Sequence, residues 1–331
     1  MSSAHPGPPP IALVSLSIRD FRGIERLDLD FRGPDGLPSN LIVLAGPNGS
    51  GKTAVLEAAL IAAGGHKLAV GRQGKRAIRR GAEDYEIRAE FRPGRPDDDV
   101  AILVTSTEPA NAPSPERPFW YFSSWRAPTF VGAVDVTVGK PGRRPAKTDP
   151  NRLRNVKQSL ANAAAIENFP GVKRSLFPGY SAWIANLNEA WRKFCPDQSE
   201  TFSVGLAEPD DDSGPGAFEI YHDREGRPPV PLDDLSAGQL ELFLFLSALV
   251  LNNDSEGIVF IDEPELHLDP QWHAPILRSL MRLQPRAQFV VATHSPAIYD
   301  AAKSYERHFL VPDGDPRAWA WSRDREVEAG A

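Results

Sequence analysis

Residues Gly46 to Thr53 read GPNGSGKT, a glycine-rich loop of the form GxxxxGK[ST]. The apolar run from Asn40 to Ala45 comes before this loop, and an Ala- and Leu-rich segment from Thr53 to Ala63 follows it. An uninterrupted apolar run predicts a strand that is buried on both faces, and the later segment predicts a helix. A strand, a glycine-rich loop and a helix in this order predict an α/β P-loop fold with a mostly parallel core sheet.

The residue types in this loop suit phosphate binding. Glycines let the backbone wrap closely, so that several N–H groups face phosphate oxygens, and the start of the helix adds a partial positive charge. Lys52 is placed to reach the β- and γ-phosphates of ATP, and the Thr53 hydroxyl is placed to coordinate Mg²⁺. The expected nucleotide contacts are Asn48, Gly49, Ser50, Gly51, Lys52 and Thr53.

A second apolar run, from Gly257 to Ile261, ends in the carboxylates of Asp262 and Glu263. Taken alone, this pattern also fits a strand followed by a polar turn. With a P-loop upstream it is typical of a Walker B strand. It then predicts Asp262 as a Mg²⁺ ligand, usually through water, and Glu263 as the group that orients and partly deprotonates the attacking water.

A third pattern, LSAGQ from Leu235 to Gln239, stands directly before the apolar segment from Leu240 to Leu251. Ser236 is a good N-cap for a helix there, and the small residues after it permit close approach of a phosphate. A simple helix cap is the alternative for LSAGQ alone. Its position between the P-loop and Asp262 favours a second phosphate-contacting loop.

With these motifs in this order, the sequence resembles the ABC-class ATPases, whose signature motif is LSGGQ-like. The resemblance implies a homodimer in which the signature of one subunit contacts the γ-phosphate held by the P-loop of the other. The signature residues it implies are Ser236, Ala237, Gly238 and Gln239. It also implies that Asp269, within DEPELHLDP, is the D-loop acid and that His294, within THSP, senses the γ-phosphate. The catalytic residues it implies are Lys52, Glu263 and His294.

The motifs DEPELHLDP and THSP, together with RDFRG at residues 19–23, resemble those of the soluble, non-transporter branch of this class. That branch includes RecF-like recombination ATPases, structural-maintenance-of-chromosomes relatives and the overcoming-lysogenisation-defect (OLD) family. The resemblance implies that Arg22 approaches the nucleotide. Many OLD proteins carry a TOPRIM nuclease domain, but about 37 residues follow His294, so we expect any nuclease to be another chain.

The sequence departs from the class at the Q-loop, where no convincing glutamine occurs. Gln73 lies in a Gly- and Arg-rich stretch and fits poorly. Arg126, within SSWR, stands at a suitable place and is the candidate Q-loop substitute. A surface arginine beside a core tryptophan is the alternative.

The pattern of segments predicts an ATPase domain interrupted by an insertion. Alternation at Tyr85 to Phe91 and Val100 to Thr105 predicts an antiparallel β subdomain, and Phe202 to Leu206 with Ala217 to His222 predicts strands that return to the main body. Four segments are expected: a disordered tail over 1–10, the N-terminal part of the ATPase domain with the P-loop over 11–140, a helical lobe insertion over 141–200, and the C-terminal part over 201–331 with the signature, Walker B, D-loop and switch histidine.

Composition indicates where the protein is located and what it contacts. The chain of 331 residues has a net charge of −7 and a single cysteine, Cys195, which favours a reducing, cytoplasmic location. No apolar run approaches the length that a bilayer requires, so no membrane association is expected. The basic stretch from Lys67 to Arg80 could contact duplex DNA, and a solvated charged loop is the alternative.

These features predict an ATPase that couples ATP to a conformational switch in DNA repair or anti-phage defence. The alternative is a regulatory ATPase that gates a separately encoded effector, such as a nuclease or toxin; the acidic net charge favours it. A transporter motor subunit is the least supported hypothesis, because the Q-loop glutamine is missing and a helical segment separates the strands.

Overall fold

A computed structural model describes residues 11–65, 77–93, 100–105, 119–123, 152–168, 180–195, 200–207, 217–250 and 257–311. At its centre is a five-stranded sheet with the order β12-β3-β11-β10-β6, in which every neighbouring pair is parallel. This confirms the expected parallel core sheet. Its strands are β3 (Leu41–Ala45), β6 (Phe119–Phe122), β10 (Ile258–Asp262), β11 (Gln288–Thr293) and β12 (Arg307–Phe309).

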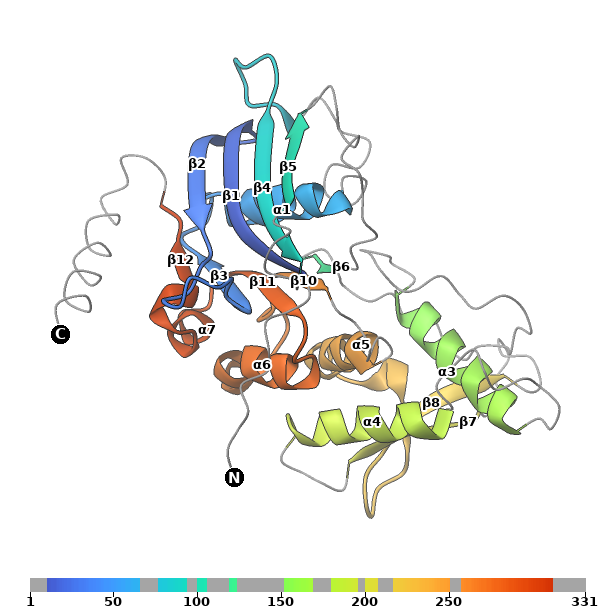
Figure 1. The fold of residues 1–331 in the computed structure, drawn as a ribbon. Helices are drawn as coiled ribbons and strands as arrows, with labels where there is room; N and C mark the ends of the chain where they lie inside the picture. The colour runs from blue at the N-terminus through green and yellow to red at the C-terminus, as the bar shows by residue number, and fades with distance from the viewer. Residues whose placement is uncertain are drawn as a thin grey trace.

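A second, antiparallel sheet has the order β2-β1-β4-β5. Its strands are β1 (Ile11–Phe21), β2 (Ile24–Asp30), β4 (Glu86–Pro93) and β5 (Val100–Thr105). Helix α1 (Lys52–Leu60), followed by the short π-helix η1 (Ile61–Gly65), contacts both β1 and β11, so it lies between the two sheets (Figure 1). The expected antiparallel subdomain is therefore present beside the core.

The parallel sheet separates two hydrophobic cores. On β3, Leu41 and Val43 pack into one core, whereas Ile42 and Leu44 pack into the other. The side chains of β10 and β11 alternate in the same way, as expected for strands covered on both faces. One core contains α1 and the antiparallel sheet, and the other contains the helices on the opposite face of the parallel sheet (Figure 1).

Three helices pack on this opposite face and on the strand ends: α5 (Ala237–Val250), α6 (Pro270–Leu283) and α7 (Pro296–Ala301). Every residue of α5 from Leu240 onward is buried, which explains its almost uniformly apolar sequence. Helix α6 continues through Pro275. Within the described ranges, no helix is both long enough and apolar enough to cross a membrane.

Helices α3 (Arg152–Asn168) and α4 (Tyr180–Arg192) contact α5 and a small antiparallel sheet. That sheet has the order β7-β8-β9, with β7 (Thr201–Leu206), β8 (Phe218–Asp223) and β9 (Val230–Pro231). These strands were expected to return to the main body, but they form their own sheet. The reason is packing: the Phe202 ring lies 4.8 Å from Trp191 of α4 and 4.7 Å from Phe243 of α5.

One buried amide joins the two large sheets. The Gln288 side chain, at the start of β11, is fully buried. Its Oε1 accepts a hydrogen bond from the Leu13 backbone N–H at 2.7 Å, and its Nε2 donates to the Leu13 and Ser39 carbonyls at 3.0 and 2.8 Å. The amide therefore satisfies backbone groups of β1 near the register shift between Leu13 and Ser15.

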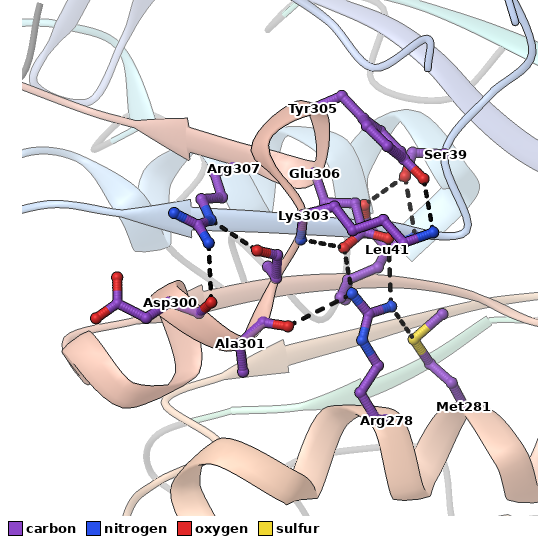
Figure 2. A network of polar contacts seen from close by, with 11 residues as sticks. Ser39, Leu41, Arg278, Met281, Asp300, Ala301, Lys303, Tyr305, Glu306 and Arg307 are labelled. Atoms are coloured by element: carbon purple, nitrogen blue, oxygen red, sulfur yellow. Dashed lines mark hydrogen bonds and ion pairs between the residues drawn. The ribbon is translucent and has the colours of Figure 1, made fainter. Parts of the chain in front are cut away.

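An ion pair fixes α6 to the segment that leads into β12 (Figure 2). Arg278 Nη2 lies 2.6 Å from Glu306 Oε2, and this carboxylate also accepts the Lys303 backbone N–H at 2.7 Å. The Arg278 guanidinium additionally bonds the Ala301 carbonyl at 3.5 Å. The contacts hold the last strand of the parallel sheet next to β3.

Candidate functional site

The loop after β3 has the backbone that a P-loop requires. Gly46, Gly49 and Gly51 have φ values of 155°, 81° and 90°, a region that side-chain-bearing residues rarely adopt. A Cβ on Gly46 would also overlap the Leu310 carbonyl oxygen. At Gly46 both the backbone angle and the space therefore require glycine, and at Gly49 and Gly51 the backbone angle does.

The side chains of Lys52 and Ser50 in this loop offer polar groups that a phosphate could bind. The buried Lys52 Nζ donates to the Gly46 and Pro47 carbonyls at 2.9 and 3.0 Å. Burial lowers the pKa of Lys52, and the nearby Glu263 and Asp262 carboxylates oppose that shift. The Ser50 Oγ is buried and has no hydrogen-bond partner within the described part of the chain. A lysine held by two carbonyls and an unsatisfied hydroxyl are the groups that phosphate oxygens would engage.

Thr53 and Asp262 come together although 209 residues separate them. The Thr53 hydroxyl lies 3.2 Å from both carboxylate oxygens of Asp262, which ends β10 and is 1% exposed. Hydroxyl and carboxylate oxygens are the ligands that Mg²⁺ prefers. The donor set beside the P-loop therefore fits a hard divalent cation.

Glu263 and His294 face each other at the ends of neighbouring strands. Glu263 has a left-handed backbone, with φ of 54°, and its N–H donates to the Ala292 carbonyl at 2.7 Å. Its Oε1 lies 2.9 Å from His294 Nε2. Both side chains remain partly exposed, at 27% and 37%, so both can meet a ligand. A carboxylate paired with an imidazole is suited to orienting a water molecule.

Glu265 is a site residue that sequence reasoning missed. Its Oε1 accepts three hydrogen bonds, from the Thr293 hydroxyl at 2.8 Å and from the N–H groups of His294 and Ser295 at 2.6 and 3.0 Å. The Ser295 hydroxyl in turn caps α7 by accepting the Ile298 N–H. The acidic residue two positions after Glu263 was the only available sequence signal. Glu265 sets the course of the backbone that carries His294.

The predicted signature loop and the predicted D-loop contact each other within the same chain. Ser236 and Gln239 form a reciprocal cap at the start of α5, with Ser236 Oγ 3.0 Å from Gln239 Oε1. A Cβ on Gly238 would overlap the carbonyl oxygen of His267, which has a left-handed φ of 66°. Asp269 caps α6 by accepting the Gln271 N–H at 3.0 Å. Ser236 and Ala237 are exposed.

Arg22 lies against α1. Its guanidinium is 2.6 Å from Glu57, one turn after Thr53, and its backbone is left-handed with φ of 53°. Burial raises the pKa of Glu57 to about 7, although the Arg22 charge opposes this shift. Burial also raises the pKa of Tyr121, and the charges of Glu57 and Asp262 add to that effect. Arg22 thus belongs to a polar cluster behind the P-loop, next to Asp262.

Some predicted features lie outside the described residues. They are Arg126, the tail over 1–10 and most of the basic stretch from Lys67 to Arg80. Of that stretch, Arg79 pairs with Glu25 at 2.6 Å and with Asp20 at 3.7 Å. Its charge is therefore balanced within the chain.

Two families match the sequence. One, described as "AAA domain, putative AbiEii toxin, Type IV TA system", matches residues 122–300, and another, described as "AAA domain", matches residues 15–112. A Septu protein PtuA of Bacillus thuringiensis is 42% identical over 62 residues, which are 19% of this chain and 16% of the relative. A retron Vc95 probable ATPase of Vibrio cholerae serotype O1 biovar El Tor is 34% identical over 86 residues, which are 23% of this chain and 17% of the relative. The matched stretches thus cover about a sixth of these relatives.

Solved structures share the fold. An Smc head domain from Pyrococcus furiosus, bound to the C-terminal domain of ScpA, has a TM-score of 0.55 at 15% identity and covers 96% of this chain and 100% of that one. The Smc head domain from Pyrococcus yayanosii has a TM-score of 0.56 at 13% identity and covers 92% and 96%. At such low identity the likeness establishes the architecture alone. That architecture is the one these Smc head domains share.

Proposed function

Because the chain belongs to the family described as "AAA domain, putative AbiEii toxin, Type IV TA system", we propose that it binds and hydrolyses ATP as a nucleotide-sandwiched homodimer. The observation that carries the proposal is the meeting of four side chains beside the P-loop. Thr53 contacts Asp262, and Glu263 contacts His294, at adjacent ends of β10 and β11. Groups of these types perform phosphoryl transfer in P-loop ATPases.

The P-loop would hold the phosphates of ATP through its N–H groups and Lys52. Lys52 would exchange its bonds to the Gly46 and Pro47 carbonyls for phosphate oxygens. Thr53 and Asp262 would hold Mg²⁺, which supplies neutralisation of the phosphate charge. Glu263 would orient the attacking water and accept its proton, while His294 fixes the Glu263 carboxylate and approaches the γ-phosphate.

The dimer is proposed from the exposed signature loop. Ser236 and Ala237 face solvent, and Gly238 packs on the D-loop backbone at His267. A loop of small residues capped at a helix start is suited to a phosphate held by a second subunit. Two such contacts related by a two-fold axis would close a symmetric dimer around two ATP molecules.

The first test is ATP turnover by the purified chain. Lys52→Ala should lose both ATP binding and turnover, whereas Glu263→Gln should keep binding and lose turnover. Lys193→Ala serves as the matched control, because this lysine is exposed and pairs with Glu189 one turn away. Unchanged binding and turnover in Lys52→Ala would refute the site.

The second test is the ATP-dependent mass of the Glu263→Gln variant, measured by light scattering. A shift from monomer to dimer on adding ATP supports the sandwich. Adding Ser236→Arg to the same chain should abolish the shift, because a long charged side chain would occupy the phosphate contact. A dimer that ignores both ATP and Ser236→Arg would contradict the arrangement.

For the biological role we propose anti-phage defence, with the ATP cycle gating a separately encoded effector. The names of the family and of the Septu and retron relatives support it. The balanced charge of Arg79 and the net charge of −7 favour a protein partner over duplex DNA, and the single buried cysteine, Cys195, agrees with a cytoplasmic location. Purification of the chain with its genomic neighbours should yield a partner whose release depends on ATP. Turnover stimulated by linear duplex DNA, without any partner, would favour the DNA-acting alternative.

A further inference from the structure

A fully buried lysine lies outside the nucleotide site. Lys157 of α3 is 0% exposed, and its Nζ lies 2.7 Å from Glu219 Oε1 and 2.8 Å from Glu219 Oε2. The same Nζ lies 3.0 Å from Asp233 Oδ2. Glu219 belongs to β8, so one ammonium group joins three separate elements.

Asp233 lies at the entrance to the signature loop. It belongs to the 3₁₀ helix η4 (Leu232–Asp234), and the motif that begins at Leu235 follows immediately. Leu232 and Leu235 are buried on either side of it, and the Leu235 N–H donates to the Leu232 carbonyl. The bond from Lys157 therefore fixes the chain two residues before the motif and three before Ser236.

Helix α3 holds this lysine firmly. Leu153, Val156 and Leu160 flank Lys157 on the helix and are fully buried, and α3 contacts both α5 and β8. Figure 1 shows α3 and β8 beside α5, the helix that starts within the signature loop. A buried ammonium without its carboxylates is strongly unfavourable, so the triad tolerates little change in distance. A displacement of α3 would therefore be passed to η4.

We propose that Lys157 is a positioning residue for the signature loop, acting through Asp233 to hold Ser236 in place for the nucleotide of the partner subunit. The proposal rests on the dimer proposed above. It makes α3 the element through which a bound partner can alter closure of the ATP site. Neither Lys157 nor Asp233 contacts nucleotide in this scheme.

Asp233→Ala is the most specific variant, because it removes the ion pair between Lys157 and the segment before the signature loop and leaves the Lys157–Glu219 pair. Asp234→Ala is the matched control: Asp234 is the next residue of η4 and is exposed. We expect Asp233→Ala to bind a fluorescent ATP analogue normally at its own P-loop and to lose turnover on the order of tenfold or more. Asp234→Ala should behave as the wild type. Lys157→Met should repeat the pattern with a lower melting temperature.

Mixing variants tests whether the defect lies in the signature half of the site. Lys52→Ala damages the P-loop half, so a mixed dimer of Lys52→Ala and Asp233→Ala contains one intact composite site. Mixing should restore turnover that neither variant shows alone, because each mixed dimer has one working site of two. The reference mixture is Lys52→Ala with Ser236→Arg.

The outcomes separate the inference from the function on which it rests. Turnover in Asp233→Ala equal to that in Asp234→Ala overturns the inference, as does loss of ATP binding by Asp233→Ala. Rescue in the Ser236→Arg mixture without rescue in the Asp233→Ala mixture overturns the inference and leaves the dimer standing. Failure of the Ser236→Arg mixture overturns the dimer and the inference together. Rescue in both mixtures supports the inference.

Discussion

Four residues other than glycine have a left-handed backbone within the described ranges: Asp20, Arg22, Glu263 and His267. Such a conformation costs energy and persists only where the surroundings impose it. Glu263 and His267 stand on the turn between β10 and α6, where one faces His294 and the other supports Gly238. Individual backbone angles therefore decide which groups this turn presents to the proposed nucleotide site and which to the predicted signature loop.

Gly238→Ala tests the contact between the signature loop and the D-loop. Alanine usually stabilises a helix by about 1 kcal/mol relative to glycine. Here the new Cβ would overlap the His267 carbonyl, so we expect a loss of about 1–3 kcal/mol in the free energy of unfolding and weaker ATP-dependent dimerisation. Urea unfolding and light scattering measure these effects. Gly23→Ala is the control, because nothing lies within 4 Å of its Cβ, and an equal loss there would refute the explanation.

Glu57→Gln should change how stability depends on pH. Burial raises the pKa of Glu57 from 4.5 to about 7, so between these values the folded chain keeps a proton that the unfolded chain releases. The stability from this proton is fully present below about pH 4.5 and is lost as the pH rises to about 7. Glutamine does not titrate, so the decline over this range should be smaller by on the order of 1–3 kcal/mol. Urea unfolding across the range measures it, with the exposed Glu189→Gln as control; parallel profiles for wild type and Glu57→Gln would contradict the assignment.

At the scale of elements, the site consists of two turns held together by one carboxylate. Glu265 lies in the turn after β10, and its side chain accepts three hydrogen bonds from residues at the end of β11 and before α7. The two strands are neighbours in the parallel sheet, so their carboxyl ends already lie side by side. Glu265 converts that proximity into a defined position for His294.

Glu265→Ala should reduce the maximal turnover rate while leaving ATP binding close to wild type. The substitution leaves the N–H groups of His294 and Ser295 without this acceptor, at a cost of about 1–3 kcal/mol in stability. If Glu265 acts through His294, the double variant with His294→Ala should be no slower than His294→Ala alone, a non-additivity that steady-state kinetics measures. Additive losses would show an independent role for Glu265.

The elements differ in how far the sequence could predict them. β3, β10 and β11 were predictable because strands covered on both faces must be continuously apolar. The proximity of Lys52, Thr53, Asp262 and Glu263 was predictable, because the strand–loop–helix order and the acidic strand end place them at one edge of the sheet. The separate sheet of β7 and β8 was not, because the packing of Phe202 between α4 and α5 is a tertiary contact. Contacts such as Lys157 with Asp233, 76 residues apart, leave no local pattern either.

At the scale of the whole molecule, the parallel sheet gives each strand a role in both hydrophobic cores. Phe260 of β10 packs into the core with α1, and Phe289 of β11 packs into the core with α5. The two strands pair along the whole of β10. Loss of order in one core would therefore remove one face of the strands on which the other depends.

Phe260→Ala and Phe289→Ala test this coupling. Both rings are fully buried, so each truncation should cost about 3–5 kcal/mol. Each should shift a single unfolding transition to lower denaturant, seen equally by circular dichroism and by tryptophan fluorescence. Leu37→Ala, at a 42% exposed site, is the control. Two separate transitions, each sensitive to only one of the substitutions, would refute the shared sheet as the source of cooperativity.

The buried amide of Gln288 has a consequence for recombination between relatives. It links Leu13 to a residue 275 positions later, so the two ends of the chain are matched by one side chain. A chimera that took its first strand from this protein and its last third from a relative with leucine at this position would lose the hydrogen bonds of this amide to two carbonyls and an N–H. Gene exchange that divides the chain between these points must therefore carry both ends together, or supply a new donor and acceptor at the joint.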